Sequence, residues 1–280
     1  SKTGAGRVVF AGQNTLSGPL TVEAGTLTLA SDASSVTGLV YRLDASQPAT
    51  LTFLADGSNV TAWADAEGSG FAFATTNDLN CPVYNAALFG GRGGLHFGRG
   101  GARGRMLGSG VTNAQTVFAV NMIRDQSNDN GGFWGMEGQD SGLRIGNTTW
   151  YWPGNNNDFH YGGAGGLVAV NGIVSNSVVT VGQIHLVTSV NGARQTFRPA
   201  IGDYWGSSQW TSRYYRGDVA EILVYDRSLT ALERQTVEAA LMAKWFPAGS
   251  GSVLPSSASV TVQAGGTLDL AGGAFTVASL

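Results

Sequence analysis

Cysteine, lysine and histidine are all scarce in this sequence. The 280 residues contain a single cysteine, Cys81, so no disulfide can form within the chain. Charged residues make up 12% and the net charge is −3, which argues against a dedicated binder of nucleic acid or of anionic membranes. Three histidines, His96, His160 and His185, stand far apart, without the ligand spacing of a zinc site. No apolar run reaches the roughly 18 residues of a membrane span, so no membrane insertion is expected.

Glycine, by contrast, is abundant. The chain holds 42 glycines and is 42% hydrophobic, a composition that favours many short strands and tight turns around a sizeable core. The segment Gly90–Arg105 is rich in glycine and arginine, like a nucleic-acid-binding RGG box. Leu95 and Phe97 alternate with a polar residue as in a strand, so we expect a strand there and no nucleic-acid partner. The planar guanidinium groups of this segment could still line a site for an acidic sugar, and they belong to Arg99, Arg103 and Arg105.

One stretch, Gly217–Trp245, predicts a strand followed by a helix. Its first half, GDVAEILVY, is rich in β-branched residues, as strands are. Thr230 and Glu233 then have the spacing of a capping box, which starts a helix. Glu221 falls inside the strand, where its carboxylate needs a partner, and the candidates are Arg213 and Arg144.

This stretch resembles the closing segment of bacterial laminin-G-like (concanavalin A-like) jelly-roll domains. In that family a strand of the form G-D-[IV]-A-E-[IV]-[LIV]-[VI]-Y-[DN]-R leads into a short helix that ends in K-W, as it does here at Trp245. Leu43–Ser46 and Val60–Asp65 resemble two earlier landmarks of the family. The resemblance implies an all-β fold, a concanavalin A-like β-sandwich with one short C-terminal helix. Lectins, adhesins and enzymes share this fold, so it does not determine the ligand.

Two nearly identical phrases stand about 240 residues apart near the ends of the chain. Thr21–Ala30 reads TVEAGTLTLA and Thr261–Ala271 reads TVQAGGTLDLA. Apolar residues alternate in both, which predicts strands with glycine turns. Such short flanks need neighbours to stack on, so they either pair with each other or dock on further repeats.

The flanks resemble the autotransporter-associated β-strand repeat of long exported passenger proteins, a β-solenoid module. This resemblance implies a secreted or cell-surface location in a bacterium, with neighbouring repeats of the same protein as partners. The predicted organisation places the first half of a repeat at residues 1–35 and its second half at 249–280. The laminin-G-like domain, residues 36–248, is then inserted into the middle of one repeat.

The most ligand-like segment is Asn147–Tyr161, NTTWYWPGNNNDFHY. Flat aromatic faces bind sugars through C–H groups, while amides and carboxylates bind hydroxyls. The same residues are equally compatible with a strand whose tryptophans fill the core. A second aromatic-rich loop, Ile201–Tyr215, could share one end of the sandwich with the first. The predicted ligand-binding residues are Trp150, Trp152, Asn155, Asn156, Asp158, Trp205 and Trp210.

The polar loop Arg124–Gly132 carries the one candidate metal site. Asp125, Ser127 and Asp129 stand at alternate positions that resemble the first oxygens of a calcium loop, and the two aspartates are the predicted ligands. Met136 occupies the twelfth position, where an EF-hand has glutamate, so only a looser calcium site is open to this loop; the alternative is an ordinary hairpin. No other cofactor is expected.

Catalytic signatures are missing from the sequence. Retaining β-glucanases of this fold carry an E-x-D-x-x-E strand, and nothing here matches it. We therefore expect that the chain is not an enzyme but a module for glycan binding or adhesion in a large exported surface protein. The alternative is a structural or assembly unit of a surface fibre or layer, and a lesser alternative is a polysaccharide-degrading enzyme.

Overall fold

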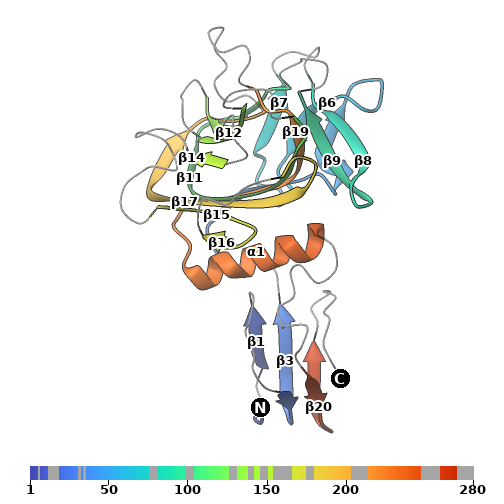
Figure 1. The fold of residues 1–280 in the computed structure, drawn as a ribbon, viewed down its shortest axis with the longest axis vertical. Coiled ribbons are helices and arrows are strands. Elements are labelled where there is room, and N and C mark those ends of the chain that lie inside the picture. Colours follow the sequence, from blue (N-terminus) through green and yellow to red (C-terminus); the bar gives the residue numbers. More distant parts are fainter. Residues whose placement is uncertain are drawn as a thin grey trace. The chain divides into compact units, whose positions relative to one another are not determined.

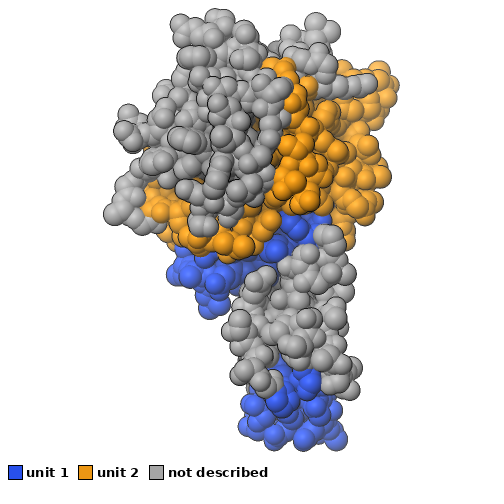
Figure 2. Space-filling model, in the orientation of Figure 1, with its two compact units in different colours: residues 1–37, 229–280 blue, residues 38–228 orange. Residues whose placement is uncertain are grey.

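The computed structural model forms two compact units, which Figure 2 distinguishes by colour. The repeat unit comprises residues 1–37 and 229–280, and the sandwich unit comprises residues 38–228. The predicted limits 1–35, 36–248 and 249–280 stay a prediction. The structure describes residues 1–5, 7–11, 19–30, 33, 36–75, 81–98, 104–125, 131–137, 142–145, 151–153, 166–174, 180–202, 214–246 and 259–269.

The described strands of the sandwich unit form two eight-stranded antiparallel sheets (Figure 1). The first, here called the long-strand sheet, contains β16 (Ile173–Val174), β15 (Leu167–Val170), β17 (Ile184–Phe197), β11 (Thr112–Ile123), β19 (Gly217–Tyr225), β9 (Arg92–Phe97) and β8 (Val83–Phe89), with β4 (Leu39–Asp44) paired to β19. The second, the short-strand sheet, contains β14 (Tyr151–Pro153), β13 (Gly142–Ile145), β12 (Gly131–Met136), β18 (Pro199–Ile201), β10 (Met106–Gly108), β7 (Ala72–Thr75), β6 (Val60–Ala64) and β5 (Leu51–Phe53). A 3₁₀ turn, η2 (Pro48–Thr50), lies directly before β5.

The hydrophobic core lies between these sheets. Alternate residues of β19, among them Ile222 and Val224, belong to one buried cluster with residues of both sheets. Tyr41 of β4 and Trp134 of β12 join the sheets directly, because the Trp134 indole Nε1–H donates to the Tyr41 hydroxyl at 3.1 Å. The expected all-β sandwich is thereby confirmed.

The structure confirms the predicted strand and helix of Gly217–Trp245. Every residue of β19 is buried, and the strand pairs with β11, β4 and β9. Helix α1 (Ala231–Trp245), part of the repeat unit, begins with the predicted capping box of Thr230 and Glu233.

The structure gives Glu221 a partner that the sequence did not suggest. Arg42 binds it, with 2.6 Å between the Arg42 Nε and a Glu221 carboxylate oxygen. The antiparallel register of β4 and β19 explains this choice, since it places Asp44 opposite Glu221 and Arg42 two residues away on β4. Arg213 and the side chain of Arg144 lie outside what the structure describes, so these two candidates stay a prediction.

In the repeat unit the two flanks pair with each other. β3 (Gly25–Ala30) lies between β1 (Arg7–Ala11) and β21 (Gly266–Asp269), and β2 (Leu20–Val22) pairs with β20 (Val260–Val262). All these pairs are parallel, as in the coils of a solenoid. The two similar phrases stand in register, with Thr21 opposite Thr261 and Leu27 opposite Leu268.

His185 of β17 gives the sandwich a predicted pH dependence. Burial lowers its pKa below the ordinary value of about 6.5, and a hydrogen bond with the Thr180 backbone opposes this effect in part. The folded state therefore favours neutral His185, so its contribution to stability is complete above pH 6.5 and is lost as pH falls towards the lower folded pKa.

We expect the urea midpoint to fall between pH 7.5 and pH 5.5, and to fall less in the His185→Gln variant, whose side chain does not titrate. If the urea midpoints of the native chain and of His185→Gln fell by the same amount between these two pH values, this assignment would be contradicted. A His96→Gln variant is the control, because it also removes one histidine but from a partly exposed position.

Candidate functional site

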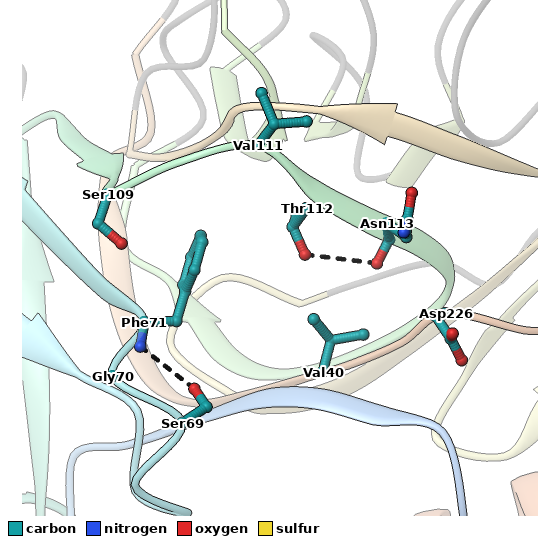
Figure 3. Close-up of a pocket in the computed structure, with 9 residues that line it drawn as sticks. All are labelled: Val40, Ser69, Gly70, Phe71, Ser109, Val111, Thr112, Asn113 and Asp226. Carbon is teal, nitrogen blue, oxygen red and sulfur yellow. Dashed lines mark hydrogen bonds between the residues drawn. The ribbon is translucent and has the colours of Figure 1, made fainter.

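A cavity of about 480 Å³ lies in the sandwich unit where strands of both sheets begin or end (Figure 3). The long-strand sheet contributes β4, the start of β11 and the residue after β19, and the short-strand sheet contributes the segments next to β7 and β10. The lining residues are Val40, Ser69, Gly70, Phe71, Ser109, Val111, Thr112, Asn113 and Asp226. The cavity is thus built by segments that lie far apart in the sequence.

The apolar part of this cavity is centred on Phe71. Its ring stacks on Tyr41, with 4.9 Å between centroids and 6° between planes, and meets Phe73 edge-on at 5.6 Å. Two aromatic contacts hold the ring in one orientation, and Figure 3 shows it standing in the space that the other lining residues surround. Val111 adds an aliphatic surface that is 66% exposed. The cavity therefore offers a fixed flat ring beside an accessible aliphatic side chain.

Short polar side chains complete the wall. The Ser69 and Ser109 hydroxyls accept hydrogen bonds from the backbone N–H groups of Phe71 and Ala72, at 3.2 and 3.3 Å. Each hydroxyl keeps its own hydrogen to donate. The Asn113 side-chain oxygen accepts from the Thr196 hydroxyl at 2.7 Å, so its amide nitrogen is the group that can donate to a ligand.

Asp226 is the one ionisable group among the residues that line the cavity. The Arg194 guanidinium lies 3.8 Å from its carboxylate, and the side chains of Arg194 and Asp226 are 57% and 40% exposed. At this distance and exposure the ion pair is weak, which leaves the carboxylate able to accept hydrogen bonds from hydroxyl groups. Its backbone is fixed, because the Asp226 N–H donates to the Gly38 carbonyl at 3.0 Å.

The predicted aromatic site falls almost wholly outside the described residues. Trp152 belongs to β14, opposite Arg144 of β13. The other predicted residues, Trp150, Asn155, Asn156, Asp158, Trp205 and Trp210, lie beyond the described part of the chain. The aromatic site therefore stays a prediction. Our sequence reasoning missed the Phe71 cavity, and the only signal for it was the alternating run Phe71–Thr75.

The structure gives Asp125, half of the predicted calcium pair, a different partner. Its carboxylate lies 2.7 Å from the Arg216 guanidinium. Asp129 lies outside the described residues, so the calcium loop stays a prediction. Within the described ranges there is no group of three or more acidic, histidine or cysteine residues that could hold a metal ion.

No helix in the described part of the chain is long and apolar enough to cross a membrane.

Residues 1–38 match the passenger-associated-transport-repeat family. This confirms the predicted repeat at the N-terminal flank and indicates an exported surface protein. No curated protein matches the chain.

Several solved structures are similar to the chain. A Trypanosoma rangeli sialidase in complex with the inhibitor DANA shares 15% identity at a TM-score of 0.44, over 72% of this chain and 33% of the sialidase. The same sialidase in complex with sialic acid shares 16% identity at 0.44, over the same shares of the two chains. Domain 4 of AbnA, an extracellular GH43 arabinanase from Geobacillus stearothermophilus in complex with arabinotriose, shares 12% identity at 0.39, over 71% of this chain and 97% of that domain. The chain thus spans about a third of the sialidase's length.

These likenesses concern the fold alone, a β-sandwich, and do not single out a laminin-G-like domain. They also correct one expectation from the sequence, that the chain is not an enzyme. The matching structures come from a sialidase and from a domain of an arabinanase, so the missing E-x-D-x-x-E strand does not exclude a glycosidase-like fold.

Proposed function

We propose that the sandwich unit is a laminin-G-like, glycan-binding module of an exported bacterial surface protein. The observation that carries this proposal is the Phe71 cavity, which combines a fixed aromatic ring with hydroxyl, amide and carboxylate groups. Sugars present apolar C–H faces and a rim of hydroxyls, and such a ligand needs both kinds of surface.

Each part of the cavity has a role in this proposal. The Phe71 ring and Val111 contact the C–H face of a sugar ring. Ser69, Ser109 and the Asn113 amide donate to sugar oxygens, and the Asp226 carboxylate accepts from sugar hydroxyls. The predicted aromatic loops with Trp150 and Trp205, and calcium at Asp125 and Asp129, stay part of the proposal as a second contact region.

The Phe71→Ala variant tests this role. We expect it to weaken glycan binding at least tenfold, because it removes the stacking surface, and tenfold corresponds to about 1.4 kcal/mol. The purified chain would be screened on a glycan array with and without calcium, followed by titration with the best ligand. The same ligand would be assayed for hydrolysis.

Phe53→Ala is a matched control. Phe53 is also a partly buried aromatic, in edge-on contact with Tyr84 at 5.6 Å, but it does not line the cavity. Its loss should lower stability and leave binding unchanged. If binding survives Phe71→Ala but is lost in Trp150→Ala/Trp205→Ala, the site lies at the aromatic loops. If a folded chain binds no glycan at all, the proposal is wrong.

A structural role is the second candidate, and the parallel register of the two flanks favours it. Repeat coils that pair in this way, such as β3 with β21, can be part of a longer solenoid. In that case the sandwich would be a domain carried by a surface fibre, and the glycan array would be silent while the fold stays intact.

A further inference from the structure

Two arginines of the sandwich unit converge on one glutamate close to the cavity. Arg105 precedes β10, Arg198 lies between β17 and β18, and Glu137 follows β12. A guanidinium nitrogen of each arginine lies 3.4 Å from a different oxygen of the Glu137 carboxylate. The cluster therefore carries two positive charges and one negative charge.

The Glu137 carboxylate does not occupy all the hydrogen-bond donors of these two guanidinium groups. Charge-assisted N–H···O bonds are usually about 2.7–2.9 Å long, and both contacts are longer. The Arg105 side chain is only 18% exposed, and its buried Nε has no hydrogen-bond partner among the residues that the structure describes. A guanidinium that is largely removed from water and only partly bonded favours an additional anionic partner.

Backbone contacts hold the cluster in place. The Arg198 Nε donates to the Gly108 carbonyl at 2.7 Å, and the Glu137 N–H donates to the Arg198 carbonyl at 2.9 Å. Arg198 therefore reaches Glu137 from a fixed position, with its remaining terminal N–H groups available.

The cluster is also connected to the cavity. Gly108 is the residue before Ser109, which lines the cavity. A Cβ atom at Gly108 would lie 2.9 Å from the Phe71 ring and 2.9 Å from Pro199, the residue after Arg198. The backbone that anchors Arg198 thus packs against the aromatic ring of the proposed sugar site.

We propose that Arg105 and Arg198 form an anion-binding subsite for the carboxylate or sulfate group of an acidic glycan. This inference rests on the proposed glycan-binding function and narrows its ligand class. The sugar ring would lie against Phe71, and its acidic substituent would bind the guanidinium pair, whose planar forks match the two oxygens of such a group.

The first test uses inorganic sulfate as the probe of the subsite. Sodium sulfate would be titrated calorimetrically into the whole chain at constant ionic strength, with chloride as the balancing anion. We expect saturable binding that weakens about tenfold in Arg198→Gln, since one of two charged partners is lost. Arg194→Gln is the matched control, because Arg194 is similarly exposed and belongs to a different ion pair. No saturable binding by the native chain, or equal binding by Arg198→Gln, would overturn the subsite.

The second test separates the acidic-glycan inference from glycan binding itself. Trigalacturonate and its fully methyl-esterified form share one sugar backbone, but esterification replaces each carboxylate with a neutral methyl ester. Further acidic and neutral pairs would come from the array. We expect acidic members to bind about tenfold more tightly than neutral ones, and Arg198→Gln to abolish this preference. If glycans bind without preference for charge, the inference is wrong and the proposed function stands. If sulfate binds but no glycan does, both the acidic-glycan inference and the proposed glycan-binding function are wrong.

Discussion

Replacement of Arg42 by methionine is expected to lower the free energy of unfolding by about 3–5 kcal/mol, because it removes the cation from a buried ion pair. Glu221 is fully buried, and the Arg42 Nε lies 2.6 Å from its carboxylate. Asp44, which is also buried, lies opposite Glu221 and within 3.5 Å of the same guanidinium. Without Arg42, two carboxylates on adjacent strands would lose their shared counter-charge.

Urea unfolding of the variant and the native chain measures this effect. Arg42→Lys should lie between the two, because an ammonium group keeps the charge but not the planar fork. The control Arg194→Gln removes an arginine from the exposed pair with Asp226 and should change stability by less than about 1 kcal/mol. The double variant Arg42→Met/Glu221→Leu should recover much of the loss. A loss below about 1 kcal/mol in Arg42→Met would contradict the assignment.

Trp134→Ala is expected to cost a similar amount, about 3–5 kcal/mol, as is usual for the truncation of a buried tryptophan. Trp134 is fully buried in the core, and its ring meets Phe197 edge-on at 5.6 Å. Its indole N–H donates to Tyr41 across the two sheets. The substitution therefore removes packing and one of the direct links between the layers of the sandwich.

Tyr41→Phe isolates the polar part of this link. It keeps the aromatic stack on Phe71 but removes the acceptor of the Trp134 indole, which should cost about 1–3 kcal/mol. Thermal and urea unfolding, read by near-UV circular dichroism, measure both variants. An unchanged midpoint in Tyr41→Phe would mean that the indole finds another acceptor, and a loss below about 1 kcal/mol in Trp134→Ala would contradict its place in the core.

Local patterns predicted the elements that depend on local sequence. The β-branched run of Gly217–Tyr225 and the capping box of Thr230 and Glu233 specify a strand and a helix without reference to the rest of the chain. The two similar sequence segments near the chain ends likewise predicted strands. These strands pair so that equivalent residues of the two segments lie opposite each other, as Leu27 and Leu268 do.

Contacts that depend on strand register could not be predicted in the same way. The need of Glu221 for a cation was evident, but the choice of Arg42 follows from the pairing of β4 with β19 across nearly the whole unit. The cavity also depends on how distant strands pair, because its lining residues come from separate segments of the chain. They include Val40, Phe71, Ser109, Asn113 and Asp226. Runs of aromatic residues drew our prediction to Trp150 and Trp205 instead.

The hydrogen bond between the Asp226 N–H and the Gly38 carbonyl has a consequence for the entropy of the chain. It keeps the two ends of the folded sandwich together, although roughly 230 residues separate β3 from β20. If that insert were unfolded, closing so long a loop would cost on the order of 5 kcal/mol before β20 and β21 could pair with their neighbours. Unfolding of the sandwich is therefore expected to weaken the pairing of β20 and β21 with the first flank by a free energy of this order, which couples the stability of the repeat to that of the inserted domain.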